Sequence, residues 1–365
     1  MVEHGGFEPP TPCLPGKCSP AELMPLDAVS VAGFGEGGQR SRAGAQCGMR
    51  GSARRDGGLL GCDTGGGMLE LALVGTGGML PLPERWLASA LIRYNGHLVL
   101  FDCGEGTQIS LRALGWGIKD IGVLLISHVH GDHVAGLPGL LLTLGNSGRT
   151  EPVDIVGPPG LIAVVTGLRV VAAYLPFEVR CRELESGDSF AHAGMRITCV
   201  AAEHHVRCLA YRLDVPRAPR FLPDRARSLG VPLVDWKRLQ RGEVVGNVRP
   251  QEVLGPPRPG LSVGLVTDTR PTSAIADLVN GVDLLVCEAT FGDDADQLRA
   301  LERKHMTFRE AAELASAANA SRLVLTHFSP SVTRPEDYAS NALDVFANTT
   351  IGSDHLSVTL RFQKD

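Results

Sequence analysis

Residues 127–133 have the sequence SHVHGDH, and this run constrains the fold and chemistry of the chain more than any other feature. It holds three histidines and one acid within six positions: His128, His130, Asp132 and His133. Imidazole nitrogens and carboxylate oxygens suit Zn²⁺ and similar divalent ions. Side chains two apart in extended backbone share a face, so His128 and His130 are expected to hold one ion. The glycine that follows lets the chain turn, so that Asp132 and His133 face a second ion.

The flanks of this run predict a rigid support. Residues 121–126 are apolar and typical of a buried strand, and residues 136–139 (GLPG) open a helix. A loop at the end of a strand is where a scaffold can present a fixed set of ligands. The alternative, a histidine-rich tag, would lack such apolar, structured flanks.

Three further candidate ligands follow apolar runs later in the chain: His204, Asp268 and His327. Taken singly, each would more often be a capping or core polar residue. Together with the cluster they complete two sites, one with three histidines and one with two histidines and Asp132. Asp268 can bridge both.

Strands and helices alternate from Met68 onward, which predicts sheets sandwiched between helical layers. An Asn-Gly pair at 95–96 predicts a tight hairpin. The expected strands are 68–74, 90–94, 97–101, 121–126, 153–157, 196–202, 208–214, 262–267, 283–287 and 322–326. The expected helices are 159–173, 273–279, 307–319 and 335–346.

The composition narrows the class of protein. A chain of 365 residues with 44% apolar and 21% charged residues is ordinary for a globular protein. Its net charge of −5 predicts no general attraction to nucleic acid, so such binding must be local. We expect no membrane span and no signal peptide. Nine scattered cysteines without a CxxC pair indicate reduced thiols in a cytoplasmic protein.

Residues 1–67 differ from the rest, being rich in Gly, Arg, Ser and Pro, which is typical of a disordered extension. A sharper interpretation comes from back-translation. Codons for residues 5–10 (GGFEPP) pair GGNGG with CCNCC around a seven-base loop, as in the complement of a tRNA T arm. The first two codons contain the complement of a CCA end, and residues 18–23 fit the complement of a D arm. We therefore expect a misassigned start, with Met68 as the true one.

A basic segment at 214–258 is the candidate RNA-binding arm. Between residues 217 and 258 there are nine basic and four acidic residues, a local charge of +5. Eight prolines between residues 216 and 259 break the segment, which predicts a protruding arm that holds RNA through its phosphates. The alternative is a solvated charged insertion. The candidate contacts are Arg217, Arg220, Arg225, Arg227, Lys237, Arg238 and Arg241.

The order and spacing of these ligands resemble the metallo-β-lactamase superfamily, and the surrounding blocks resemble its ribonuclease Z family, endonucleases that process tRNA 3′ ends. The matching blocks are 101–108 (FDCGEGTQ), 136–141 (GLPGLL), 267–271 (TDTRP), 287–291 (CEATF) and 325–329 (LTHFS). The resemblance covers about residues 68–362. It implies an αββα four-layer sandwich over 68–365, with the arm protruding, and a homodimer whose arm serves the partner's active site.

The chain departs from the family pattern at four places. Thr267 stands where the family usually has Gly, and Cys287 where it has His. Residues 305–307 are HMT in place of HST, and the arm lacks the family's Gly-Pro motif near residues 230–236. These departures leave the metal ligands unchanged and bear more on how the substrate is bound.

The resemblance also implies a mechanism on precursor tRNA. Two Zn²⁺ ions acidify a shared water, and Asp132, a ligand beside that water, accepts its proton. By resemblance, His305 protonates the departing 3′ oxygen and Glu288 orients His305. The products are a tRNA with a 3′ hydroxyl and a trailer with a 5′ phosphate. The alternative for His305 is a helix N-terminal histidine of no consequence.

Two other functions compete with this one. The first is a metallo-β-lactamase-fold phosphodiesterase or hydrolase acting on a small molecule, against which the basic arm argues. The second is a non-catalytic RNA-binding subunit that kept the fold. It predicts lost ligands, and none of the seven is missing.

Overall fold

The computed structural model describes residues 67–363. The expectations for residues 1–67, including the misassigned start, therefore fall almost wholly outside the described residues. Within the described range, no helix is long and apolar enough to cross a membrane.

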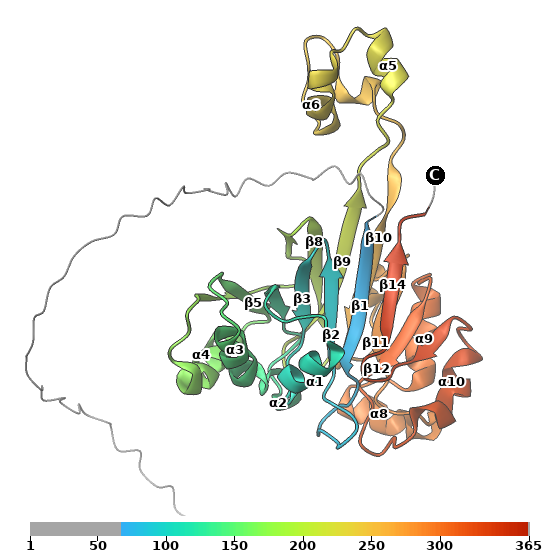
Figure 1. The fold of residues 1–365 in the computed structure, drawn as a ribbon. Coiled ribbons are helices and arrows are strands. Elements are labelled where there is room, and N and C mark those ends of the chain that lie inside the picture. The colour runs from blue at the N-terminus through green and yellow to red at the C-terminus, as the bar shows by residue number, and fades with distance from the viewer. Residues whose placement is uncertain (1–66, 364–365) are drawn as a thin grey trace, which may run out of the picture. The chain divides into compact units, whose positions relative to one another are not determined.

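Two seven-stranded mixed sheets form the centre of the described structure (Figure 1). The first has the order β14 (Ser357–Arg361), β1 (Met68–Gly75), β2 (Ser89–Tyr94), β3 (His97–Phe101), β4 (Ile121–Leu125), β5 (Val153–Gly157) and β6 (Val179–Glu183). The second has the order β13 (Thr349–Ile351), β12 (Leu323–Thr326), β11 (Leu284–Glu288), β10 (Arg258–Val266), β9 (Cys208–Arg217), β8 (Met195–Ala202) and β7 (Ser189–His192).

Alternation along the strands explains how the layers form. In β3, Val99 and Phe101 face the core between the two sheets, while Leu98 and Leu100 face outward into a second apolar cluster. The β2–β3 turn is Asn95-Gly96, whose φ angles of 50° and 81° suit the tight hairpin that the sequence predicts.

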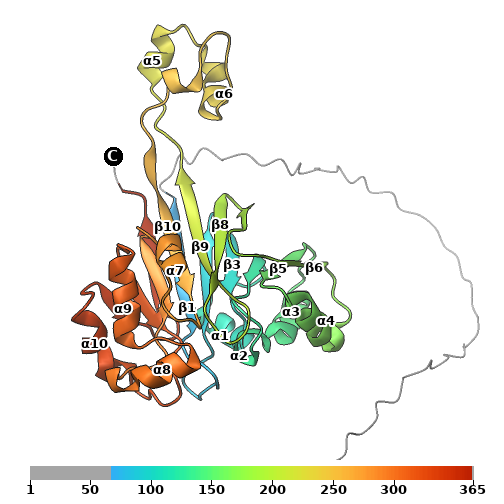
Figure 2. The same cartoon turned by 180° about the vertical axis from the view of Figure 1, so that it is seen from behind.

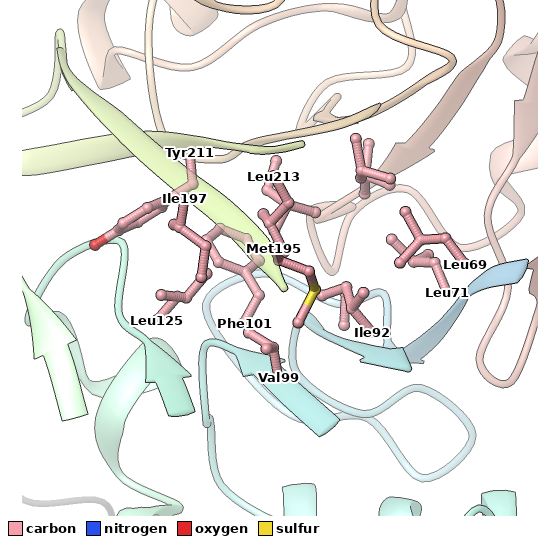
Figure 3. Packing of buried hydrophobic residues seen from close by; sticks show 14 of the residues in the cluster. Leu69, Leu71, Ile92, Val99, Phe101, Leu125, Met195, Ile197, Tyr211 and Leu213 are labelled. Atoms are coloured by element: carbon pink, nitrogen blue, oxygen red, sulfur yellow. The ribbon is translucent and has the colours of Figure 1, made fainter. Parts of the chain in front are cut away.

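The core between the sheets is apolar and continuous (Figure 3). Leu69 and Leu71 of the first sheet and Ile197 and Leu213 of the second are among its buried members. Tyr211 is also fully buried, and its hydroxyl donates a hydrogen bond to the carbonyl of Ile126 at 2.8 Å. This bond fastens the second sheet to the strand end from which residues 127–133 start.

Helices cover the outer face of each sheet, so the predicted four-layer αββα sandwich is confirmed (Figures 1 and 2). The first sheet packs against α1 (Thr107–Leu114), α3 (Leu137–Asn146) and α4 (Leu161–Leu168). The second packs against α7 (Ser273–Leu278), α9 (Phe308–Ala317) and α10 (Ala339–Leu343).

The arm extends beyond the ends of β9 and β10 (Figures 1 and 2). It contains α5 (Pro223–Ser228), α6 (Trp236–Gln240) and the 3₁₀ turns η2 (Leu233–Asp235) and η3 (Pro250–Glu252). The sequence predicts a proline-broken arm, but the structure adds a small core of its own: Ala226, Val231, Leu239 and Val253.

Several elements differ from the sequence-based expectations. The helix expected at 159–173 is α4 followed by the 3₁₀ helix η1 (Arg169–Ala172), and the one at 335–346 is η5 (Pro335–Tyr338) followed by α10. The sequence did not predict α2 (Gly131–Val134), η4 (Asp294–Asp296), α8 (Gln297–Arg303), β6, β7, β13 or β14. All four missed strands lie at sheet edges, where fewer side chains are buried and the apolar pattern is weak.

Candidate metal centre and active site

Each predicted ligand lies shortly after a strand, in a loop or, for Asp132 and His133, in the short helix α2. Residues 127–133 follow β4, and His204 follows β8. Asp268 follows β10 and His327 follows β12, two strands of the parallel part of the second sheet. The carboxyl ends of neighbouring parallel strands meet at one edge of a sheet, which is why ligands far apart in sequence converge.

The first ligand group contains His128, His130, His204 and Asp268, whose ligand atoms lie within 4.8 Å of one another. His130 Nδ1 is 3.0 Å from His128 Nε2 and 3.3 Å from His204 Nε2. Asp268 Oδ2 is 3.7 Å and 3.9 Å from the same two Nε2 atoms. Two donors about 2.0–2.1 Å from a tetrahedral ion stand roughly 3.4 Å apart, so this spacing suits a single ion.

The second ligand group contains Asp132, His133 and His327. Asp132 Oδ2 lies 3.5 Å from His133 Nε2 and 3.7 Å from His327 Nε2. Asp268 Oδ1 lies 3.4 Å and 3.1 Å from these two nitrogens. Asp268 thus presents one oxygen to each group, which is the geometry of a bridging carboxylate.

The donor atoms themselves fit a metal. The Nε2 atoms of His133 and His327 are buried and have no hydrogen-bond partner among the described residues. Buried polar atoms in folded proteins are nearly always satisfied, because an unpaired one costs free energy. A divalent cation between the two rings would satisfy both nitrogens.

A second layer of side chains fixes the histidine rings. Nδ1 of His133 lies 2.8 Å from Asp102 Oδ2, and Nδ1 of His327 lies 3.0 Å from Thr290 Oγ1. Nδ1 of His128 lies 3.0 Å from the hydroxyl of Ser127. With Nδ1 held in this way, Nε2 of each ring points to the ligand group, as is usual for metal-binding histidines.

Left-handed backbone marks the same region. Asp102, Asp268 and His327 have φ angles of 56°, 46° and 60°. This conformation costs a non-glycine residue roughly 1–3 kcal/mol and persists where the surroundings over-determine it. Here the bend turns each side chain from the strand direction into the centre.

The carboxylates stay ionised in spite of burial. Burial alone would raise the pKa of Asp132, but the neighbouring His133 and His327 rings, 3.5 and 3.7 Å from Oδ2, lower it far below its ordinary value. The same two histidines lower the pKa of the buried Asp268, again against burial. Burial lowers the pKa of His204 to about 4, so this ring is neutral and free to bind a cation at neutral pH.

Glu288 and His305 form a hydrogen-bonded pair beside the two ligand groups. Nδ1 of His305 lies 3.1 Å from Glu288 Oε1, and its Nε2 lies 4.0 Å from Asp268 Oδ2. Burial alone would lower the pKa of His305, but the charge and hydrogen bond of Glu288 outweigh it and raise the pKa to about 9. Glu288 is fully buried and also accepts from Thr269 N and Thr290 Oγ1, each at 2.7 Å.

Sequence reasoning did not assign two residues that hold the centre. Asp102, within a quoted family block, orients His133 and also accepts from Ser127 N at 2.7 Å. Met79 N donates to Asp132 Oδ2 at 2.8 Å from the loop after β1. The position of Asp102, an acid directly after an apolar strand, could have indicated its role from sequence. The contact of Met79 is made by its backbone nitrogen, so the sequence carries no sign of it.

Three residues that depart from the family pattern, Thr267, Cys287 and Met306, are buried near the centre or in the adjoining apolar cluster. The Thr267 hydroxyl donates to Asp268 Oδ1 at 2.6 Å, on the oxygen that faces the second ligand group. Cys287 is fully buried in the apolar cluster beneath α9 and contacts no ligand group. Met306 is buried in the same cluster.

The seven candidate RNA contacts are distributed over the arm and its base. Arg217 is half-buried beside Phe362, and Arg225 donates to the carbonyl of Glu252. Arg220 and Lys237 are exposed. The remaining three are exposed arginines that pair with acids of the arm: Arg227 with Asp224, Arg238 with Asp235 and Glu243, and Arg241 with Glu243.

Comparison with known proteins first defines the class. The family description "Beta-lactamase superfamily domain" matches residues 253–328, and "Anti-Pycsar protein Apyc1" matches residues 69–213. The metallo-β-lactamase fold protein YhfI from Bacillus subtilis superposes with a TM-score of 0.60 at 18% identity, covering 80% of this chain and 99% of that one. The chain is a metallo-β-lactamase-fold protein.

The relatives narrow the class to one family. The chain is 46% identical over 303 residues to Ribonuclease Z of Agathobacter rectalis and 44% identical over 303 residues to that of Lachnoclostridium phytofermentans. Each alignment covers 82% of this chain and 100% of the relative. The short form of human tRNase Z superposes with a TM-score of 0.58 at 25% identity, covering 79% of this chain and 98% of that one. The chain belongs to the ribonuclease Z family, so the small-molecule hydrolase is not favoured.

Proposed function

We propose that the protein is a zinc-dependent endoribonuclease that removes 3′ trailers from precursor tRNA. The observation that carries this proposal is the position of the Glu288–His305 pair, next to two ligand groups bridged by Asp268. Membership of the ribonuclease Z family supports the choice of substrate.

Two Zn²⁺ ions would be held by the two groups, the first by His128, His130 and His204 and the second by Asp132, His133 and His327, with Asp268 shared. When bound, such ions activate water and neutralise charge on a phosphodiester. Nitrogen and carboxylate donors at these spacings suit Zn²⁺. The unpartnered Nε2 atoms of His133 and His327 support the second position.

Asp132 takes the proton of the attacking water in this proposal. Its pKa is lowered, so it is ionised over the whole neutral range. Met79 N fixes Oδ2, which leaves the other carboxylate oxygen for the water. The water oxygen bonds to phosphorus as the bond from phosphorus to the 3′ oxygen breaks.

His305 gives its proton to that departing 3′ oxygen. Glu288 holds Nδ1 and keeps the ring protonated, so Nε2 carries the proton toward the reacting phosphate. The products are a tRNA with a 3′ hydroxyl and a trailer with a 5′ phosphate.

The arm would supply the grip on precursor tRNA. The charge of +5 on residues 217–258 contrasts with −5 for the whole chain, and the arm extends from the ends of β9 and β10 (Figure 1). The candidates Arg217, Arg220, Arg225, Arg227, Lys237, Arg238 and Arg241 would contact phosphates, so binding depends on shape and charge rather than base sequence.

We infer that the protein acts as a homodimer in the cytoplasm. The 3₁₀ helix η1 and the loop directly after it expose large apolar side chains, with Val170 77%, Val171 71% and Tyr174 96% exposed. Such exposure marks association surfaces, and a second copy of the chain is the occupant that the family resemblance implies. Four buried free cysteines, Cys103, Cys199, Cys208 and Cys287, suit a reducing compartment.

Cleavage of matched precursors tests the proposal. One precursor carries a trailer directly after the discriminator nucleotide, and the other carries an encoded CCA before the trailer. The enzyme should cut the first at one position, and the second shows how a CCA end is treated. Hydrolysis of a small phosphodiester with neither precursor cut would favour the small-molecule hydrolase instead.

A further inference from the structure

Arg270 and Glu310 form a buried ion pair next to His305. Their side chains are 13% and 8% exposed. The guanidinium donates to both carboxylate oxygens, Nη1 to Oε2 at 3.0 Å and Nη2 to Oε1. Arg270 lies two residues after the bridging Asp268, and Glu310 lies in the first turn of α9. The pair therefore joins the metal-bearing loop of β10 to the segment that carries His305.

Both members of the pair also hold the backbone around His305. Arg270 Nη1 donates to the carbonyl of His305 itself. Glu310 Oε2 accepts from Thr307 N at 3.0 Å, and Thr307 Oγ1 accepts from Glu310 N in return, a capping box at the start of α9. Glu288 fixes the imidazole ring, whereas Arg270 fixes the main chain from which that ring projects.

We propose that Arg270 and Glu310 are positioning residues that set the reach of His305 toward the departing 3′ oxygen, an inference that rests on the proposed function. The ring nitrogen Nε2 of His305 stands 4.0 Å from Asp268 Oδ2, and Arg270 joins the loop of Asp268 to the backbone of His305, next to the contacts that Glu288 makes with both loops. A bidentate arginine–carboxylate pair has a fixed geometry, so the carbonyl of His305 that Arg270 holds can move little.

The size of the effect follows from the distance dependence of catalysis. A misplacement of about 1 Å in a reacting group can cost roughly 10²-fold in rate. Lysine cannot replace the arginine fully, because its ammonium lacks the planar fork that reaches Glu310 and the His305 carbonyl together.

A pair of precursor tRNAs isolates this role from a merely structural one. One has the natural oxygen at the scissile 3′ position, and the other has sulfur there. A thiol has a pKa near 8.5, so a thiolate leaves without a proton from His305. A residue that acts through His305 matters for the oxygen substrate only.

The variants are Arg270→Met and Arg270→Lys, with Glu310→Gln as a second route if Arg270→Met fails to fold. Arg309→Met is the matched control, because Arg309 is on α9 beside Glu310 but its side chain pairs with Asp294 of η4. Metal content and KM are measured for each variant. We expect kcat of Arg270→Met to fall roughly 10²-fold on the oxygen substrate and much less on the sulfur substrate.

Arg270→Lys and Glu310→Gln should show the same selectivity with a smaller loss, at unchanged metal content and KM. Equal losses on both substrates, or no loss on either, would overturn the inference while wild-type cleavage keeps the proposed function. A wild-type enzyme that cuts neither tRNA would instead overturn the proposed function, and the inference with it.

Discussion

The Nδ1 atom of His133 lies 2.8 Å from the buried carboxylate of Asp102, which also accepts hydrogen bonds from the backbone and hydroxyl of Ser127. This contact fixes the ring so that Nε2 faces Asp132 and Asp268. Asp102 therefore acts on the second ligand group without being a member of it.

Asp102→Asn should weaken metal binding by roughly 10–100-fold, since residues behind a metal ligand typically contribute that much. Competition with a chelator, monitored by metal release, measures the change. Asp354→Asn is the control, because Asp354 is a half-buried acid that accepts from Trp86 N and Thr76 and contacts no ligand group. Equal metal release from both variants would mean that Asp102 only stabilises the fold.

The wild-type protein should contain about two divalent ions per chain, because two ligand groups share Asp268. His133→Ala removes one donor of the second group and should retain about one ion. Elemental analysis of purified protein checks both values, with the exposed His97→Ala as control. An active wild-type enzyme with a single ion would rule out the dinuclear site.

The pH profile should report the Glu288–His305 pair. His305 must be protonated to act as an acid, and its pKa is raised from 6.5 to about 9, so kcat should fall as pH rises through about 9. Glu288→Gln removes the charge that raises this pKa, and burial then shifts the fall to lower pH. Profiles of kcat on precursor tRNA measure the shift, with the exposed Glu302→Gln as control. A fall at the same pH in both variants would refute the assignment.

Replacing residues 220–255 of the arm by a short Gly-Ser turn should weaken precursor tRNA binding far more than hydrolysis of a small phosphodiester. The arm has its own core, so the sandwich should fold without it. The affinity for tRNA should fall steeply with salt in the wild type, and this dependence should flatten in the deletion. The test is the affinity for precursor tRNA measured over a series of salt concentrations. If the salt dependence is the same in the deletion variant as in the wild type, RNA binds elsewhere on the protein.

Substituting charged residues into the exposed apolar stretch at residues 170–174 should dissociate the proposed dimer. Val171→Lys and Tyr174→Lys each place an ammonium where a second copy would pack, because both side chains are more than two-thirds exposed, at 71% and 96%. Analytical ultracentrifugation should show a dimer for the wild type and a monomer for the double variant. A wild-type monomer, or a variant that stays dimeric, would contradict the proposed surface.

Local patterns were sufficient to predict most of the candidate centre. The cluster at 127–133 and the acids and histidines after apolar strands are visible in sequence, because a strand end fixes where the next side chain lies. The central strands were predictable because they bury most of their side chains and leave apolar runs, whereas the edge strand β6, with the pattern VRCRE, buries too little to leave one.

Contacts made only by the folded chain could not be predicted. Arg270 meets Glu310 across 40 positions, and Met79 reaches Asp132 across 53 through a backbone nitrogen that any residue possesses. The core of the arm was missed because its prolines conceal two helices of five and six residues, too short to show a helical period.

End mapping of the cleavage products tests the central claim most directly. A precursor tRNA with a 3′ trailer is incubated with the metal-loaded protein, and both new ends are identified. The account predicts one cut, giving a tRNA with a 3′ hydroxyl and a trailer with a 5′ phosphate, lost on chelation and restored by Zn²⁺. Intact precursor, or products with a 3′ phosphate and a 5′ hydroxyl, would contradict it.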